Sequence, residues 1–172
     1  MTIHIRKCTV GDLDSLLDIS KKTFYETFEK QNTEENMSAY SEKTYQKEKF
    51  ISELEHPHSQ FFYIFYKDQL AGFLKLNILY AQSEPMGDDA LEVERIYILN
   101  DFQKLGLGKA LLKLAHDEAQ RLGKKNIWLG VWEYNSNAIA FYKKQNFKEV
   151  GAHSFFMGDD EQTDLILKKE LI

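Results

Sequence analysis

Near the start of the chain, the apolar positions change from an alternating to a helical pattern. Ile3 and Ile5 alternate with polar neighbours, which predicts a short first strand. Thr9 lies three residues before Asp12, the spacing of a capping box at the start of a helix. The apolar residues that follow recur every three or four positions and predict an amphipathic helix: Leu13, Leu16, Leu17, Phe24 and Phe28.

The next part of the chain predicts one more helix and a β-hairpin. The polar, acidic segment 29–40 predicts a loop or a broken helix. Residues 45–54 predict a second helix, which Pro57 ends. The runs 60–67 and 70–79 are strand-like, and the two residues between them predict a hairpin turn.

The second half of the chain alternates strand-like and helical segments. Residues 83–89 contain a proline and a glycine and predict an exposed loop. The remaining segments are strands at 91–99 and 126–132, helices at 106–122 and 136–144, and two strands around 147–157 and 163–170. No repeat or linker interrupts this order, so we expect one α+β domain over residues 1–172.

Composition narrows the class of protein. The net charge is −5 and the basic residues are interspersed with acids, which disfavours nucleic acid as a partner. The single cysteine, Cys8, excludes an intrachain disulfide and a thiolate zinc site. No signal-peptide pattern and no apolar run of about 18 residues occurs, so we expect a cytoplasmic protein without a membrane partner. The histidines lack metal-ligand spacing, so we predict no metal site and interpret them as surface residues: His4, His56, His58, His116 and His153.

A glycine-rich segment lies between the strand at 91–99 and the helix after it. Gly106 and Gly108 allow a tight turn, and the helix N-terminus adds about half a positive charge. Such a turn can bind an anionic phosphate group. A nucleotide P-loop would need glycine at Gln103 and serine or threonine at Ala110, and a dinucleotide loop would need glycine at Leu111. Neither pattern fits.

This segment resembles the acetyl-CoA loop of the GNAT superfamily of N-acetyltransferases, and a second motif strengthens the resemblance. The stretch from Asn135 to Phe147 is similar to the family pattern Asn-x-x-Ala-x-x-Phe-Tyr-x-x-x-Gly-Phe, except that Asn146 replaces the glycine. Asparagine tolerates the left-handed backbone that we expect at that helix end. The resemblance implies the GNAT fold, a central mixed, mostly antiparallel twisted sheet flanked by helices, with a V-shaped cleft between the two central strands.

Further stretches resemble the bacterial Pai-type polyamine N-acetyltransferases. They lie around Phe24–Phe28, Glu34–Met37, Ala81–Ser83, Glu92–Ile98, Asn126–Glu133 and Gly151–Phe155. This resemblance implies an enzyme that transfers the acetyl group of acetyl-CoA to a small amine, such as spermidine or spermine, and releases coenzyme A. The alternatives are a protein N-terminal or lysine acetyltransferase and a non-catalytic acetyl-CoA-binding regulatory module. An exposed edge strand near the C-terminus would also permit a homodimer.

Three residues are candidates for catalysis. Glu92 and Glu94 lie two apart on one strand and so point to one face. The resemblance implies that one of them is the general base, since Glu94 matches the position in polyamine acetyltransferases and Glu92 that in other members. Tyr142 matches the general acid that protonates the departing sulfur. The structural alternative is that both carboxylates line a solvated face and Tyr142 packs on the sheet.

The resemblance also implies the binding residues for both substrates. The backbone of Ile96, Tyr97 and Ile98 would pair with the pantetheine arm, with Asn135 and Tyr142 beside it. The pyrophosphate would lie on Gln103, Lys104, Leu105, Gly106, Leu107, Gly108 and Lys109, with Lys144 within reach. The first helical region and the loop after it would hold the acceptor, so that carboxylates and aromatic rings surround a polycation: Phe24, Phe28, Glu34 and Glu35.

Overall fold

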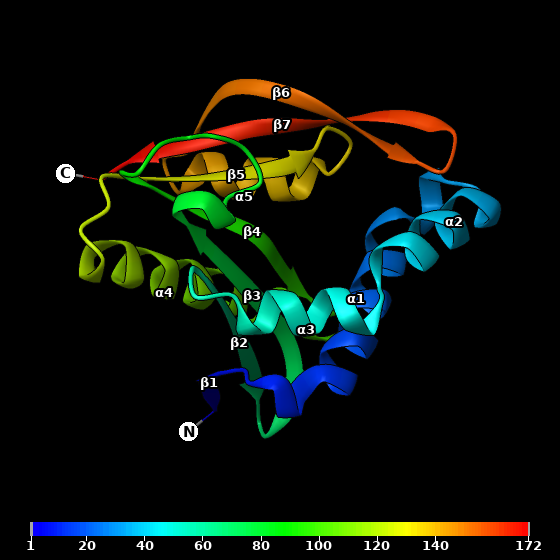
Figure 1. The fold of residues 1–172 in the computed structure, drawn as a ribbon, viewed down its shortest axis with the longest axis horizontal. Helices are drawn as coiled ribbons and strands as arrows, with labels where there is room; N and C mark the ends of the chain where they lie inside the picture. The colour runs from blue at the N-terminus through cyan, green and yellow to red at the C-terminus, as the bar shows by residue number, and fades with distance from the viewer. Residues whose placement is uncertain (1, 172) are drawn as a thin grey trace.

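A seven-stranded sheet runs through the computed structural model, which describes residues 2–171 (Figure 1). In the order in which they lie side by side, the strands are β1 (Ile3–Lys7), β2 (Ser59–Tyr66), β3 (Gln69–Ile78), β4 (Ala90–Ile98), β5 (Asn126–Trp132), β7 (Asp160–Glu170) and β6 (Lys148–Met157). Of the six pairings between these strands, β4–β5 is parallel and the other five are antiparallel. The sheet is therefore mixed and mostly antiparallel, as predicted.

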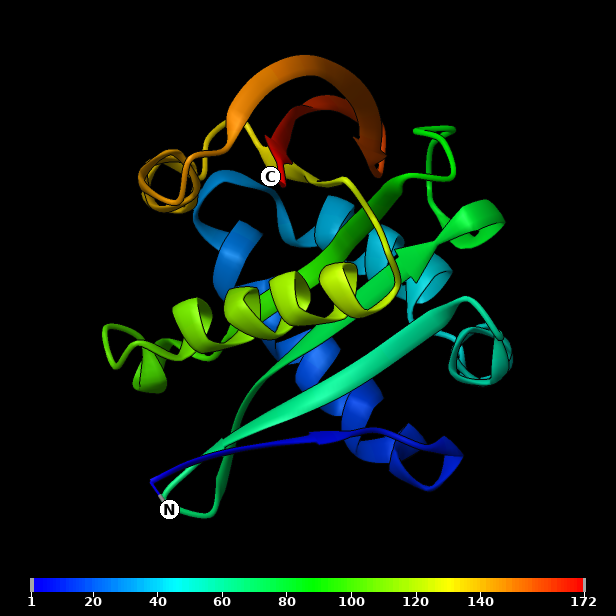
Figure 2. The same ribbon diagram turned by 90° about the vertical axis from the view of Figure 1, so that its left-hand side faces the viewer.

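Helices cover both faces of the sheet. The helix α4 (Leu107–Arg121) lies on one face, and α1 (Leu13–Phe28) and α3 (Lys47–Glu55) lie on the other (Figure 2). The helix α5 (Ser136–Lys144) follows β5 on the α4 side, and α2 (Glu34–Thr44) packs against β6. The α+β architecture is confirmed. No helix within residues 2–171 is long and apolar enough to cross a membrane.

The aromatic run in β2 is buried on both faces because helices cover both sides of the sheet. Phe62 and Ile64 join the core under α4, whereas Phe61 and Tyr63 join a second core under α1 and α3. Successive strand residues point to opposite faces, so a continuous apolar run fills two cores at once. Burial of a side chain of this kind contributes about 1.5–3 kcal/mol to folding.

The predicted start of α1 is confirmed, and a surface charge supports it. The backbone N–H of Thr9 donates to the Asp12 carboxylate at 2.9 Å, and the reciprocal bond completes a capping box. Arg6 donates two hydrogen bonds to the same carboxylate, at 2.8 and 2.9 Å. Asp12 therefore ties β1 to the first turn that leads into α1.

Of the two alternatives predicted for residues 29–40, a loop or a broken helix, the broken helix is confirmed, because a 3-10 turn at Glu29–Gln31 follows α1 and non-helical residues 32–33 separate it from α2. Helix α2 begins at Glu34, and the Thr33 hydroxyl caps it by accepting from the backbone N–H of Asn36 at 3.1 Å. Met37 is its one buried residue. Because α2 buries so little apolar surface, its sequence carries almost no helical periodicity. The next helix, predicted over 45–54, is α3 at Lys47–Glu55.

The predicted hairpin between β2 and β3 is present, but its turn lies one residue earlier than predicted. Lys67 and Asp68, with φ of 48° and 65°, join the two strands, and Gln69 already belongs to β3. Asn146, which replaces a glycine after α5, has φ of 72°. Its left-handed conformation is confirmed, so this departure from the family pattern leaves the fold unchanged.

A bulge in β4 changes which residues face each side of the sheet. Lys75 pairs with Arg95 and Leu76 pairs with Val93, so Glu94 is an extra residue without a partner in β3. Leu91, Val93, Ile96 and Ile98 pack on the α4 side. The bulge allows Glu94 and Arg95, although adjacent in sequence, to point to the same side, where Glu94 contacts Lys75 and Arg95 contacts Glu53.

The backbones of β3 and β4 approach closely at Gly72. A Cβ atom at this position would lie 2.3 Å from the Tyr97 carbonyl oxygen and 2.7 Å from Ile98 Cδ1. Both neighbours belong to β4 near the bulge. Glycine is therefore required here by space, and any side chain would push β4 out of position.

We predict that Gly72→Ala lowers the free energy of unfolding by about 1–3 kcal/mol, because the added methyl group overpacks the sheet. For a chain of this size, each kcal/mol lowers the melting temperature by about 2–4 °C. Gly151→Ala is the matched control, since its nearest contact would be Ile166 Cδ1 at an ordinary 3.8 Å. Thermal denaturation followed by circular dichroism measures both. Equal melting temperatures for the two variants would contradict the prediction.

Candidate active site

The two halves of the sheet separate where β4 and β5 stop pairing. The strands share three residue pairs, from Ala90 with Asn126 to Glu92 with Trp128. Beyond Glu92, β4 pairs with β3, while β5 pairs with β7 as far as Trp132. The remainder of β4 therefore has one edge that the described strands do not cover. This separation produces the V-shaped cleft, and it exposes the predicted pantetheine-binding backbone of Ile96, Tyr97 and Ile98.

The glycine-rich turn leads directly from β4 into α4. Lys104 and Gly106 have φ of 66° and 80°, which bends the chain so that the helix starts at Leu107. The first backbone hydrogen bond of the helix runs from Ala110 N to Gly106 O, so the preceding N–H groups are free to bind an anion. The Gln103 side chain instead folds back, donating to the Ile98 carbonyl oxygen at 3.2 Å.

A groove of about 500 Å³ lies beside this turn, between α4 and α5. Three lysines supply its positive charge, and His116 and Gln145 add polar atoms. The lysines are Lys109, Lys113 and Lys169. An anionic nucleotide group next to the helix N-terminus would suit both the shape and the charge of this groove. Lys144, on α5, is exposed and is not among the residues that line it.

Helix α5 contributes Tyr142 and is capped by Asn135. Tyr142 is only 6% exposed and packs between Phe141 and Phe147. Burial raises the pKa of its phenol, and the nearby Tyr97 raises it further. The hydroxyl therefore remains protonated at neutral pH and can donate. The Asn135 oxygen accepts from Ala138 N at 3.3 Å, which leaves its amide nitrogen available to a ligand.

A buried ionic network lies at the bulge, on the side of α3. Lys75 binds Glu53, and it binds Glu94 at 2.7 Å. Arg95 contacts the same two carboxylates, at 2.8 Å from Glu53 and 3.2 Å from Glu94. Burial raises the pKa of Glu94, but Arg95 and Lys75 outweigh burial and bring it to about 2. Glu94 is therefore a permanent negative charge at neutral pH, with 24% of its side chain exposed.

Glu92 lies deeper than Glu94 and is held by three donors. Asn77 donates to Glu92 at 2.9 Å and to Glu94 at 2.7 Å, so one amide bridges both predicted bases. The Ser83 backbone N–H donates to Glu92 at 2.8 Å, and its hydroxyl binds the other oxygen. Burial raises the pKa of Glu92, although these hydrogen bonds oppose the shift. Asn77 belongs to no motif in the sequence, and Ser83 lies in one of the stretches that resemble polyamine acetyltransferases.

A second titratable cluster stands on the other half of the sheet. His153 on β6 bonds through Nδ1 to Glu84 at 2.6 Å and through Nε2 to Asp164 on β7 at 3.3 Å. The prediction that His153 is a surface histidine is wrong, because its ring is half-buried between two carboxylates. Those carboxylates lie on opposite ring nitrogens, which is unlike a metal site, where ligands converge on one point.

Gly130 brings this second cluster next to the cleft. It lies on β5 two residues beyond the last pair with β4. A Cβ atom there would lie 3.5 Å from His153 Cε1 and 3.6 Å from Asp164 Oδ2. The cluster therefore stands directly above the β5 backbone where the cleft opens. Asp164 carried no sequence signal, because the strand pairing alone brings it to this position.

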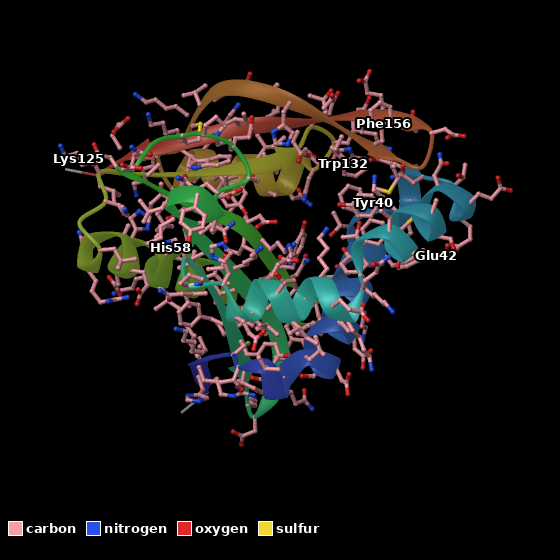
Figure 3. The ribbon with its side chains drawn as sticks, viewed as in Figure 1. Tyr40, Glu42, His58, Lys125, Trp132 and Phe156 are labelled. Carbon is pink, nitrogen blue, oxygen red and sulfur yellow. The ribbon has the colours of Figure 1, made fainter. Side chains whose placement is uncertain are left out.

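The predicted acceptor residues occupy different environments. Phe24 and Phe28 are 3% and 9% exposed and form an aromatic cluster with Trp132 and Tyr40, which point toward one another in Figure 3. Their rings are part of this buried cluster and offer little surface to a ligand. Glu34 and Glu35 are exposed at the start of α2. The structure thus brings Glu92, Glu94 and Tyr97 together at the cleft, and leaves Glu34 and Glu35 outside.

Sequence comparisons agree with the motifs. The Acetyltransferase (GNAT) family matches residues 13–147. An uncharacterized N-acetyltransferase in the pepI 3' region of Lactobacillus delbrueckii subsp. lactis is 41% identical over 170 residues, which cover 99% of this chain and 98% of the relative. The spermidine N(1)-acetyltransferase of Thermoplasma acidophilum is 26% identical over 174 residues, which cover 99% of this chain and 98% of that protein.

Structural comparisons agree with the fold. The crystal structure of the PaiA N-acetyltransferase from Thermoplasma acidophilum, in complex with coenzyme A, has a TM-score of 0.82 and 26% identity, and the match covers 99% of this chain and all of that one. The crystal structure of the ribosomal-protein-S18-alanine N-acetyltransferase from Escherichia coli has a TM-score of 0.72 and 20% identity. The match covers 98% of this chain and 93% of that one. The chain therefore belongs to the GNAT family of acetyltransferases, enzymes that transfer an acetyl group from acetyl-CoA to an amine.

Proposed function

We propose that this acetyltransferase acts on a small polycationic amine of the spermidine and spermine class. The observation that carries the proposal is the excess of carboxylates at the cleft. On the β4 side, Glu53, Glu92 and Glu94 face two cations, Lys75 and Arg95. On the β7 side, two carboxylates flank a single histidine. Both sides thus carry net negative charge, which attracts an acceptor with several ammonium groups.

The distant similarity to a spermidine N(1)-acetyltransferase supports the same substrate class. The wall formed by α1 and α2 adds Tyr40, which is partly exposed and stacks on the buried Phe24 at 4.9 Å. An aromatic ring beside carboxylates favours ammonium groups through cation–π contact. In this proposal Phe24 and Phe28 shape the wall, while Glu34 and Glu35 attract the polycation from outside the pocket.

Acetyl-CoA supplies the thioester on which the chemistry depends, and the residues present fit it. In our proposal the free edge of β4 at Ile96–Ile98 pairs with the pantetheine amides, and Asn135 donates its side-chain amide. The N–H groups of the turn 103–109 hold the pyrophosphate. The lysine-lined groove holds the nucleotide end. Lys144 remains a further candidate for the phosphates.

Tyr142 acts on the sulfur in the proposed mechanism. The amine nitrogen attacks the thioester carbonyl carbon, and the carbon–sulfur bond breaks to release a thiolate. An alkyl thiolate is basic enough to take up a proton at neutral pH, so a close donor stabilises it as it leaves. The pKa of the Tyr142 phenol is raised by burial, which keeps the proton available until sulfur departs.

The two carboxylates of β4, Glu92 and Glu94, interact with the acceptor amine in this mechanism. Glu94 remains charged because its pKa is about 2, so its charge orients the ammonium group but accepts a proton only weakly. Glu92 has a raised pKa, but it is buried and its oxygens accept from Asn77 and Ser83. We therefore assign Glu92 and Glu94 to charge stabilisation beside the nitrogen.

We predict that the enzyme releases coenzyme A from acetyl-CoA in the presence of spermidine or spermine, and that Tyr142→Phe lowers kcat by about 10²-fold or more. A thiol-release assay with spermidine, spermine, a lysine peptide and a peptide with a free N-terminus measures both. Tyr134→Phe is the control, since Tyr134 is an exposed tyrosine. Turnover of peptides alone would indicate a protein acetyltransferase. Binding of acetyl-CoA without turnover of any amine would indicate a regulatory module.

We predict that Lys109→Ala weakens acetyl-CoA binding by about three- to tenfold, because it removes one positive charge from the groove beside α4. The difference should shrink in about 0.5 M NaCl, where salt screens the phosphates. Lys143→Ala is the control, since Lys143 is exposed on α5 and does not line the groove. Titration calorimetry measures all three proteins. An equal loss in both variants would show that the groove has no special role.

A further inference from the structure

Asp164 lies on the acceptor side of the cleft, opposite the bulge in β4. In the strand register Trp132, Asp164 and His153 lie side by side across β5, β7 and β6. The Asp164 carboxylate stands over Gly130, whose missing side chain leaves it open to the cleft. Gly130 lies two residues beyond Trp128, the last residue of β5 that pairs with β4.

Three carboxylates surround this part of the cleft, and their partners differ. Glu92 is buried and accepts hydrogen bonds from Asn77 and Ser83. Glu94 binds two cationic side chains. Asp164 is 25% exposed, and within residues 2–171 its carboxylate has one partner, His153, which bonds to Oδ2. Asp164 Oδ1 is therefore the carboxylate oxygen at the cleft with the most freedom to bind another group.

The charge of Asp164 reaches across the cleft. It contributes to the raised pKa of Tyr97 on β4 and of Tyr40 on α2, although burial is the main cause for both. The charge of Asp164 thus acts on side chains of both β4 and α2. Beside it, Trp132 (Figure 3) is 6% exposed, and its indole N–H has no partner within residues 2–171. A buried donor without an acceptor indicates that a ligand or water completes this site.

We propose that Asp164, held in place by His153 and Glu84, binds the reacting ammonium group of the acceptor amine and accepts its proton. This inference rests on the proposed function and assigns the proton acceptor that it lacks. His153 and Glu84 are positioning residues. His153 fixes the Asp164 carboxylate over Gly130, and Glu84 fixes the His153 ring from its other nitrogen.

The protons balance in this scheme. One nitrogen–hydrogen bond of the ammonium breaks and its proton moves to Asp164 Oδ1, which leaves a lone pair on nitrogen. The lone pair forms the carbon–nitrogen bond and the carbon–sulfur bond then breaks. The nitrogen loses its second proton to solvent, and solvent returns a proton to the phenolate of Tyr142 after Tyr142 has protonated the sulfur. Asp164 returns its own proton to solvent, so the net products are an amide, coenzyme A and one proton.

The scheme predicts the direction of the pH dependence. Burial raises the pKa of Asp164 above its usual value, His153 lowers it and Glu84 raises it. The other groups that face it are Tyr97 and Tyr40. The carboxylate must be charged to bind and deprotonate the ammonium group. The ratio kcat/KM therefore falls as the pH drops through this raised pKa.

The test compares Asp164→Asn with Asp159→Asn, a matched control in the exposed turn of the same β6–β7 hairpin. Thiol release gives kcat/KM for spermidine from about pH 5 to 9, the range in which a raised carboxyl pKa can appear. Titration calorimetry measures spermidine binding to the coenzyme A complex, and thermal denaturation checks folding. Asp164→Glu keeps the charge if the asparagine variant does not fold. His153→Asn tests the positioning role.

We expect Asp164→Asn to lower kcat/KM by about 10²-fold or more, to flatten its acidic limb and to weaken spermidine binding, with acetyl-CoA binding unchanged. His153→Asn should show a smaller loss of kcat/KM and a shifted acidic limb, and Asp164→Glu should keep the limb.

A wild-type rate and pH profile in Asp164→Asn would overturn the inference and leave the proposed function intact. A wild-type acidic limb in His153→Asn, combined with unimpaired spermidine binding in that variant, would also count against it. Failure of the wild-type enzyme to acetylate any polyamine would overturn the proposed function itself.

Discussion

The early end of the β4–β5 pairing is the constraint on which the rest of the site depends. A sheet normally satisfies the backbone groups of each inner strand on both sides, and here one edge of β4 is released after three residue pairs. The bulge at Glu94 and the close approach at Gly72 both lie on the β3 side of this released segment. They hold β4 firmly against β3, so the strand keeps its shape although its other edge is free.

Buried charge stabilises the cleft in the same region. Lys75 and Arg95 would be costly to bury alone, but each lies between carboxylates from α3 and β4. The network fixes α3 against the bulge and keeps Glu94 ionised. The consequence for chemistry is a division of roles, because a carboxylate that neutralises two cations attracts an ammonium group better than it takes its proton.

The loop between β3 and β4 connects the two halves of the sheet. Three consecutive residues bind three different elements: Gln82 accepts from Trp128 on β5, Ser83 donates to Glu92 on β4, and Glu84 binds His153 on β6. Such a loop keeps the cleft at a fixed width without strand pairing. It also explains why stretches far apart in the sequence, around Ser83 and His153, both resemble polyamine acetyltransferases.

Elements with strong local patterns were predictable from the sequence: the capped start of α1, the β2–β3 hairpin, the glycine-rich turn before α4, and α5 with Tyr142. Local propensity and motif spacing suffice for these. The sequence left α2 open between a loop and a broken helix, because α2 buries one residue, and it did not reveal the carboxylate partners of His153. The pairing of Asp164 with His153 over Gly130, and the pKa difference between Glu92 and Glu94, arise only in the folded chain. Both depend on burial and on charges from distant segments, which no local pattern in the chain records.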